Sequence, residues 1–180
     1  MIRATVLAIV AASALAGAAR AQSSPYSPPE GDFSVDFPAQ PEVQIRPAHR
    51  SHDIGHRRYV EQEPTRALVV AIDDYPDGEL PQSADAGVYD KMLRARADND
   101  SAQLVSTRPA RLSGRPCLEG RLVDMNGVVE EVRVLLVGDR LYQLSFVHPD
   151  GADPAGADTA FFGSFRITPA NPGSGPSSER

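Results

Sequence analysis

The stretch "VVEEVRVLLVGDRLYQLSFV", residues 128–147, decides the fold class. Apolar residues alternate with charged ones in its first half, which is the two-residue period of a β-strand. Val128, Val132, Val134 and Leu136 share one face, and Glu131 and Arg133 lie on the other. Gly138 and Asp139 then form a two-residue turn, because glycine readily adopts the positive φ that such turns need. The stretch therefore predicts an antiparallel hairpin with one face covered more fully than the other.

Further strand patterns precede this hairpin. The runs at 102–112 and 115–124 flank a Ser113–Gly114 turn, and "MNG" at 125–127 is typical of a hairpin connection. Shorter runs closer to the N-terminus predict strands at 33–37, 43–45, 57–63 and 66–73. The first of these ends at Pro38, which lacks the N–H that a sheet ladder requires.

Two segments have a helical pattern instead. In "SADAGVYDKMLRARADN", residues 83–99, apolar positions recur at helical spacing, and Ser83 is the expected N-cap of a helix of about 14 residues. A second helix is expected over 153–162, with Asp153 as its cap, Pro154 at its first position and Gly163 at its end. Phe161, Phe162 and Phe165 would dock this helix on the sheet.

The order of these elements is strands, helix, strands, helix, with short links. This order predicts an α+β fold: a twisted antiparallel sheet of six or seven strands with helices packed on it, an α-β-α sandwich. A single domain is expected over 31–168. The Pro- and Ser-rich segments at 22–30 and 169–180 predict a flexible leader and a disordered tail.

The first 21 residues have the pattern of a secretory signal peptide. Arg3 precedes an apolar run from Ala4 to Ala16, and Ala19-Arg20-Ala21 predicts cleavage between Ala21 and Gln22. The run is shorter than the ~20 residues that span a bilayer, and no cysteine follows it to anchor a lipoprotein. We therefore expect a soluble protein, periplasmic or secreted, that is not embedded in a membrane.

The charge composition limits the classes of partner that the protein can bind. Asp and Glu number 24 against 18 Lys and Arg, a formal net charge of −6, whereas binding nucleic acid needs a basic face. We thus expect no nucleic acid partner. Cys117 is the only cysteine, so no disulfide forms within the chain. It is interpreted as a small half-buried apolar residue, the alternative being a reactive or intermolecularly bonded thiol.

Four segments together resemble a known family: "GDFSVDFPAQPEV" at 31–43, "LSGRPCLEGRL" at 112–122, "RVLLVGDRLYQLSF" at 133–146 and "FFGSFRI" at 161–167. Their order and spacing are similar to those of bacterial PsbP-like proteins. These exported proteins are related in fold to the extrinsic P subunit of photosystem II and to the periplasmic protein DcrB. The resemblance covers the whole expected domain. It implies an antiparallel sheet between helices and the role of a non-enzymatic assembly or stabilising subunit, and it brings no catalytic motif.

The stretch "HRSHDIGHRR", residues 49–58, is the one cluster with the composition of a metal site. On a helix, His49, His52 and His56 would share one face and could converge on Zn²⁺. On a strand, His52 and His56 would lie about 13 Å apart, too far for one ion. Pro47, Gly55 and the surrounding arginines favour an extended connection without metal, or a small basic patch that meets an anionic partner.

Other motifs are absent from the sequence. "DDYPDGE" at 73–79 fails as a calcium loop because Tyr75 and Ala84 occupy ligand positions. The chain has no G-x-S-x-G, H-E-x-x-H, P-loop or G-x-G-x-x-G. The leading hypothesis is an exported non-catalytic domain, a monomer or weak oligomer without a cofactor, that binds or stabilises an envelope protein. The alternatives are a periplasmic metal-binding protein that uses the histidine cluster and an uncatalogued hydrolase.

Overall fold

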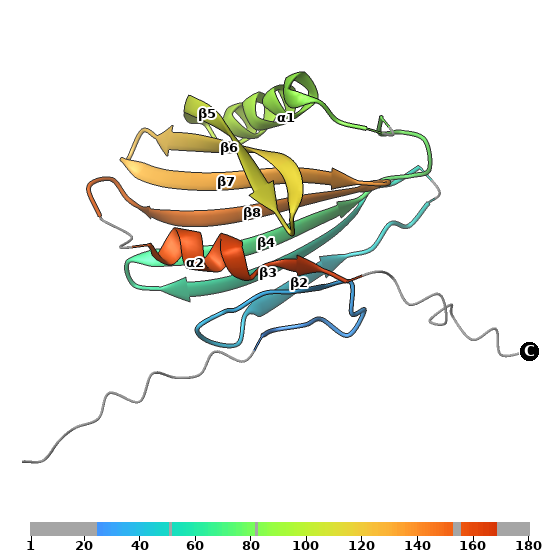
Figure 1. Ribbon diagram of the computed structural model, residues 1–180, viewed down its shortest axis with the longest axis horizontal. Coiled ribbons are helices and arrows are strands. Elements are labelled where there is room, and N and C mark those ends of the chain that lie inside the picture. The colour runs from blue at the N-terminus through green and yellow to red at the C-terminus, as the bar shows by residue number, and fades with distance from the viewer. Residues whose placement is uncertain (1–24, 51, 82, 153–155, 169–180) are drawn as a thin grey trace, which may run out of the picture.

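A seven-stranded antiparallel sheet forms the centre of the molecule in the computed structural model, which describes residues 25–50, 52–81, 83–152 and 156–168 (Figure 1). Its strand order is β2-β3-β4-β8-β7-β6-β5. The strands are β2 (Glu42–Arg46), β3 (Gly55–Glu63), β4 (Arg66–Asp74), β5 (Ala102–Leu112), β6 (Arg115–Asp124), β7 (Val128–Val137) and β8 (Arg140–Pro149). The hairpin expected over 128–147 pairs Val137 with Arg140 across its two-residue turn.

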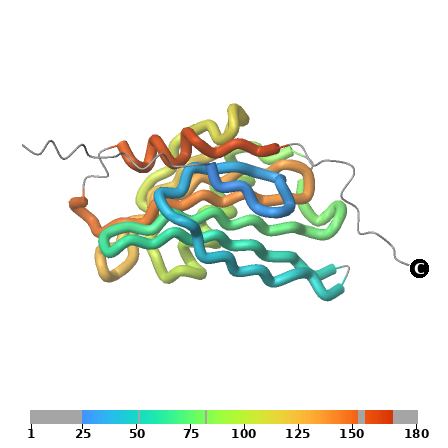
Figure 2. The backbone as a smooth tube through the Cα atoms, turned by 90° about the horizontal axis from the view of Figure 1, so that it is seen from below, coloured from blue at the N-terminus to red at the C-terminus, as the bar shows by residue number. Residues whose placement is uncertain are grey.

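Three smaller pieces cover this sheet. Helix α1 (Ala86–Asn99) packs on one face at the β5–β7 end, and helix α2 (Ala157–Ser164) lies across the other face. A two-stranded sheet of β1 (Phe33–Ser34) and β9 (Arg166–Ile167) sits on the same side as α2. In Figure 2, viewed from the β2 side, the N-terminal segment and α2 form a layer above the strands. The expected α+β sandwich is confirmed.

The apolar core lies on both faces of the sheet, and the α2 side is the larger. On that side, Phe161, Phe162 and Phe165 pack as expected on the apolar positions of β4 and β8. The core residues that these two strands contribute are Leu68, Val70 and Ile72 of β4 and Tyr142, Leu144 and Phe146 of β8. On the α1 side, the buried helix residues are Tyr89, Leu93 and Ala97, which meet Leu118, Leu122, Val132 and Val134. The unequal covering of the faces follows the alternation in the strands.

Gly120 sets how closely α1 approaches the sheet. A Cβ at this position would lie 2.9 Å from one methyl of Leu93 and 3.2 Å from a methyl of Leu104. Leu93 itself is fully buried. Glycine is therefore required here by a close approach rather than by its backbone angles.

The helix ends differ from their expected positions. The N-cap of α1 is Asp85 and not Ser83, because the Asp85 carboxylate accepts a hydrogen bond of 2.9 Å from the N–H of Val88. Asp153 and Pro154 lie outside the described residues, and α2 begins at Ala157 after Gly156, whose φ is +80°. In the described part of the chain, no helix is long and apolar enough to cross a membrane.

Candidate functional site

Two consecutive carboxylates at the end of β4, Asp73 and Asp74, each hold a group of polar side chains. Successive residues of a strand point to opposite faces, so Asp73 faces the α1 side and Asp74 faces the α2 side. Asp73 contacts His56 and Gln143, whereas Asp74 contacts Arg57 and Arg140. Each carboxylate therefore belongs to a separate polar network.

The network on the α2 side is a cluster of ion pairs. Arg57 binds Asp32 at 2.7 Å and Asp74 at 3.1 Å. Arg140 binds the same two carboxylates, with Asp32 at 2.8 Å. The Arg57 and Asp32 side chains are 9% and 7% exposed, so these charges are largely removed from water. We call Asp32, Arg57, Asp74 and Arg140 the buried ion cluster, after the two buried members; Asp74 and Arg140 are half-buried at its edge. The cluster joins the segment before β1 to β3, β4 and β8.

Arg57 of this cluster and its neighbour Tyr59 have pKa values shifted away from neutrality. Burial lowers the pKa of Arg57, but the hydrogen bond and charge of Asp32, with the charge of Asp74, outweigh burial and raise it overall. Burial also raises the pKa of Tyr59 to about 12, although the charge of Arg57 opposes this shift. Arg57 therefore stays charged and Tyr59 neutral, which suits a permanent structural cluster better than a proton-transfer site.

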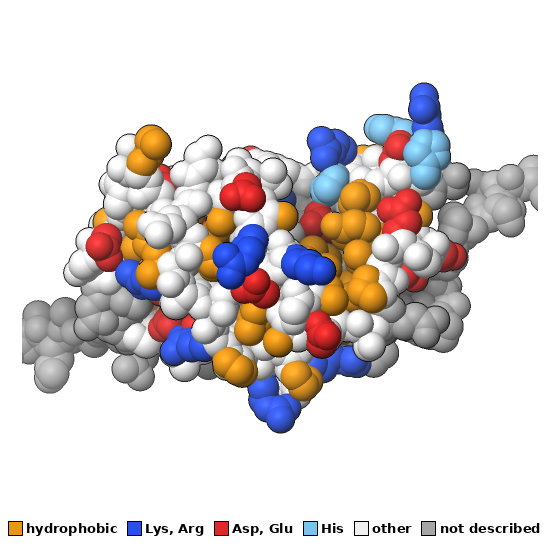
Figure 3. Space-filling view, turned by 90° about the horizontal axis from the view of Figure 1, so that it is seen from above, with side chains coloured by type: hydrophobic (Ala, Val, Ile, Leu, Met, Phe, Trp, Pro, Cys, Tyr) orange, Lys and Arg blue, Asp and Glu red, His pale blue; other side chains and the backbone are white. Residues whose placement is uncertain are grey.

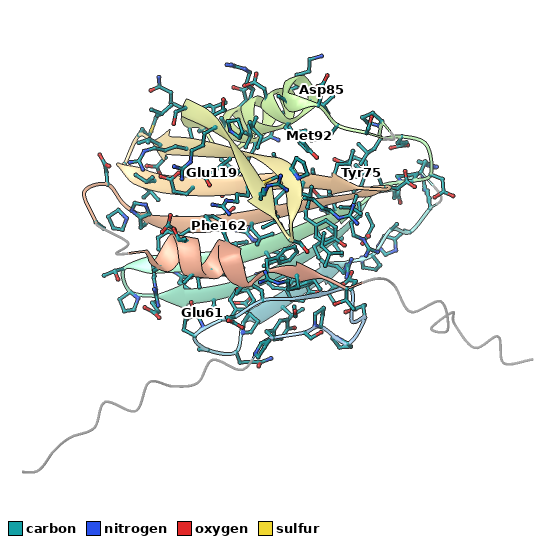
Figure 4. All side chains as sticks on the ribbon, viewed as in Figure 1. Glu61, Tyr75, Asp85, Met92, Glu119 and Phe162 are labelled. Atoms are coloured by element: carbon teal, nitrogen blue, oxygen red, sulfur yellow. The ribbon has the colours of Figure 1, made fainter. Side chains whose placement is uncertain are left out.

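A cleft of about 590 Å³ lies beside the buried ion cluster. Turns and strand ends that are distant in sequence form its walls. The lining residues are Asp74, Tyr75, Ser113, Arg115, Val137, Asp139, Arg140, Tyr142, Ile167 and Thr168. Tyr75, which follows β4, marks this end of the sheet in Figure 4. We call this space the end cleft.

The walls of the end cleft are fastened to one another. The N–H of Tyr75 donates to the carbonyl of Asp139 at 2.8 Å, and the N–H of Thr168 donates to the carbonyl of Asp32 at 3.0 Å. The N–H of Ile167 donates to the hydroxyl of Ser113 at 2.9 Å, which ties β9 to the β5–β6 turn. Two of these bonds join lining residues to each other, and the third ties Thr168 to the segment before β1, so the cleft is preformed.

Two tyrosines and two arginines are among the residues that line the end cleft. They are Tyr75, Arg115, Arg140 and Tyr142. Tyrosine and arginine are enriched among the residues that contribute most to the binding energy of protein interfaces. Arg140 is held in place by its two carboxylates. Tyr75 and Arg140 are half-buried at the cleft and Arg115 is exposed, whereas Tyr142 is buried beneath it.

The network on the α1 side contains one of the histidines in the 49–58 cluster. His56 Nδ1 lies 2.7 Å from Asp73, and Gln143 donates to the other oxygen of Asp73 at 2.9 Å. Because an ionised carboxylate only accepts hydrogen bonds, His56 Nδ1 is the donor in this contact. Arg96 of α1 extends the network, donating to Gln143 at 3.0 Å and to Glu130 at 2.6 Å.

The structure separates the histidines of this cluster. His56 lies in β3, and Gly55 begins that strand; His52 lies in the connection before it, 68% exposed and 3.8 Å from Asp53. The described part of 49–58 has no helix that would align His49, His52 and His56. Among the described residues, no group of three or more His, Cys, Asp or Glu is placed to hold a metal ion. Figure 3 shows the histidines in pale blue at one corner of the surface, with arginine or lysine nearby.

The structure also places Cys117 and the 73–79 segment, candidates in the sequence for a reactive thiol and for a calcium loop. Cys117 is buried on the α2 side of β6, and burial raises the pKa of its thiol to about 11. In the 73–79 segment, Asp73 and Asp74 end β4, and Gly78 adopts a positive φ in the turn that follows.

The sequence analysis did not single out the buried ion cluster. Asp32 precedes Phe33, and Arg57 and Arg140 each stand two residues before a buried tyrosine, Tyr59 and Tyr142 respectively. A charged residue on the core-facing side of a strand needs a partner of opposite charge when it is buried. This pattern could have indicated the cluster from the sequence.

Comparison with known proteins supports the fold. No family model and no curated protein matches the sequence. The solution structure of cyanobacterial PsbP (CyanoP) from Synechocystis sp. PCC 6803 superposes with a TM-score of 0.56 at 11% identity. The alignment covers 81% of this chain and 92% of that one. A crystal structure from Bacteroides thetaiotaomicron VPI-5482 aligns with a TM-score of 0.48 and 14% identity, over 82% of this chain and 49% of the other.

The chain therefore has a PsbP-like fold, as its four sequence segments indicated. At this level of identity the likeness concerns the fold alone, and function has to be argued from the site.

Proposed function

We propose that this protein is an exported, non-catalytic domain that binds and stabilises a protein partner in the bacterial envelope, and that the end cleft receives this partner. The observation that carries the proposal is the cleft itself, with its tyrosine and arginine lining and its preformed walls. The signal-peptide pattern of residues 1–21 supports export.

The state of the charged groups favours binding over catalysis. A general acid or base needs a proton that it can exchange near neutral pH. At the end cleft, Asp74 and Arg140 bind each other, and burial raises the pKa of both Tyr75 and Tyr142 further from neutrality. Tyr75 and Arg140, which are half-buried, can position a partner through aromatic contact and hydrogen bonds.

Site-directed photocrosslinking tests this proposal in envelope preparations. A photoreactive residue in place of Arg115, in the cleft, is compared with the same residue in place of Lys91, an exposed cation on α1. We expect one discrete adduct from position 115 and none of that size from position 91. Equal adducts from both positions, or none from 115, would contradict the assignment of the cleft.

A further inference from the structure

The edge strand β2 is exposed along its whole length. β2 is the first strand of the sheet, and all five of its residues, from Glu42 to Arg46, are exposed. Figure 2 views the molecule from this edge. An edge strand presents backbone N–H and C=O groups that can pair with a further strand.

The side chains of β2 are divided between the two faces of the sheet. Val43 and Ile45 stand opposite Tyr59 and Arg57 of β3, so they face the α2 side. There they are 42% and 55% exposed, so both aliphatic side chains are available to a partner strand. Glu42, Gln44 and Arg46 stand opposite alternate residues of β3 and face the α1 side.

The sequence of β2, "EVQIR", is complementary to itself when it runs antiparallel. With Gln44 opposite Gln44 of a second copy, each Glu42 faces an Arg46, and each Val43 faces an Ile45. Opposite charges and aliphatic side chains that meet directly across a strand pair stabilise it. We propose that two copies of this chain pair through β2 in this register, forming a two-fold symmetric dimer with one continuous sheet.

Other registers are less complementary. A shift of one residue would place aliphatic and charged side chains on the wrong faces. A shift of two residues would remove both charge pairs. Pro41 and Pro47, which flank the strand, lack the N–H that would extend the ladder. The pairing is therefore limited to Glu42–Arg46, and its small area predicts a weak dimer that depends on concentration.

The opposite edge of the sheet has features that prevent pairing. β5 contains Pro109 within the strand and an irregularity in register between Leu104 and Ser106. Prolines and bulges on edge strands block the addition of another strand. β2 has neither within its five residues, so the two edges differ in the way that the proposal requires.

Disulfide trapping tests the dimer. Gln44→Cys places two thiols on the two-fold axis, while the native Cys117 is buried. We expect an interchain disulfide on mild oxidation, much faster than for the control Gln103→Cys, an exposed position on β5. Circular dichroism confirms that each variant is folded.

Charge reversal then tests the register. In the Gln44→Cys protein, Glu42→Arg sets like charges opposite each other at both ends and should slow the crosslinking roughly tenfold. Adding Arg46→Glu restores opposite charges and should restore the rate. The dimer is refuted if Gln44→Cys reacts no faster than Gln103→Cys. The register is refuted if the double reversal stays as slow as the single one.

Discussion

Asp73 and Asp74 are neighbours on β4, yet they bind partners on opposite faces of the sheet and share none of them. Asp74 closes the buried ion cluster next to the end cleft. Asp73 holds His56 and connects through Gln143 to helix α1. One dipeptide is therefore linked through Gln143 to helix α1 on one face and through Arg57 and Arg140 to Asp32 on the other.

This relationship predicts that the two carboxylates act independently on stability. Asp74→Asn should lower the free energy of unfolding by about 2 kcal/mol, because it leaves two arginines with a single carboxylate. Asp73→Asn should lower it by about 1 kcal/mol through weaker hydrogen bonds. In denaturant titrations the double variant should equal the sum within about 0.5 kcal/mol. As a control, Asp74→Asn combined with Arg140→Gln should fall clearly short of additivity, since these residues touch.

A second prediction concerns the thiol of Cys117. Because burial raises its pKa to about 11, only about a thousandth of it is thiolate at pH 8. The folded protein should therefore react very slowly with a disulfide reagent, and faster as the pH rises. Met125→Cys, at a position that is 88% exposed, should react at once under the same conditions. Comparable rates for the two thiols would show that Cys117 is accessible.

Glu61 predicts a dependence of stability on pH. Its side chain is buried on β3, and burial, together with the charge of Glu63, raises its pKa. Since the folded pKa exceeds the unfolded one, ionisation of Glu61 costs stability as the pH rises through the folded value. Glu61→Gln should stabilise the protein by about 1 kcal/mol at neutral pH. The gain should vanish below pH ~4, where Glu61 is protonated in both states. An equal gain at both pH values would contradict this account.

The close approach of α1 at Gly120 predicts the effect of one added methyl group. Gly120→Ala should destabilise the protein by about 1–2 kcal/mol, because buried Leu93 would have to move. Gly163→Ala in α2 is the matched control: no heavy atom lies within 4 Å of its added Cβ. This change should be neutral or stabilise the helix by up to about 1 kcal/mol. Thermal unfolding of both variants measures the difference.

Strand periodicity made most of the fold predictable from the sequence. Alternation at 128–147 and in the earlier runs depends only on neighbouring residues, and the structure has the corresponding strands, although the one expected at 33–37 is limited to Phe33–Ser34. The helix caps were less predictable: Ser83 and Asp85 both suit an N-cap, and in the structure the Asp85 carboxylate accepts from the N–H of Val88.

The candidate site could be predicted only in part. The sequence indicated that the histidine cluster would separate if it were extended, but it did not pair His56 with Asp73, 17 residues further on. The end cleft and the buried ion cluster bring together Asp32, Arg57, Asp74 and Arg140 from distant segments. Such clusters depend on strand order and register, which a single strand's pattern does not contain.

The central claim is that the end cleft binds an envelope partner, and charge reversal in the cleft tests it most directly. The dissociation constant of the partner found by crosslinking would be measured for Arg115→Glu and for Lys91→Glu, two exposed cations that undergo the same change of charge. We predict that Arg115→Glu weakens binding at least about tenfold, which corresponds to about 1.4 kcal/mol, while Lys91→Glu has little effect. Equal affinities of the two variants would contradict the claim.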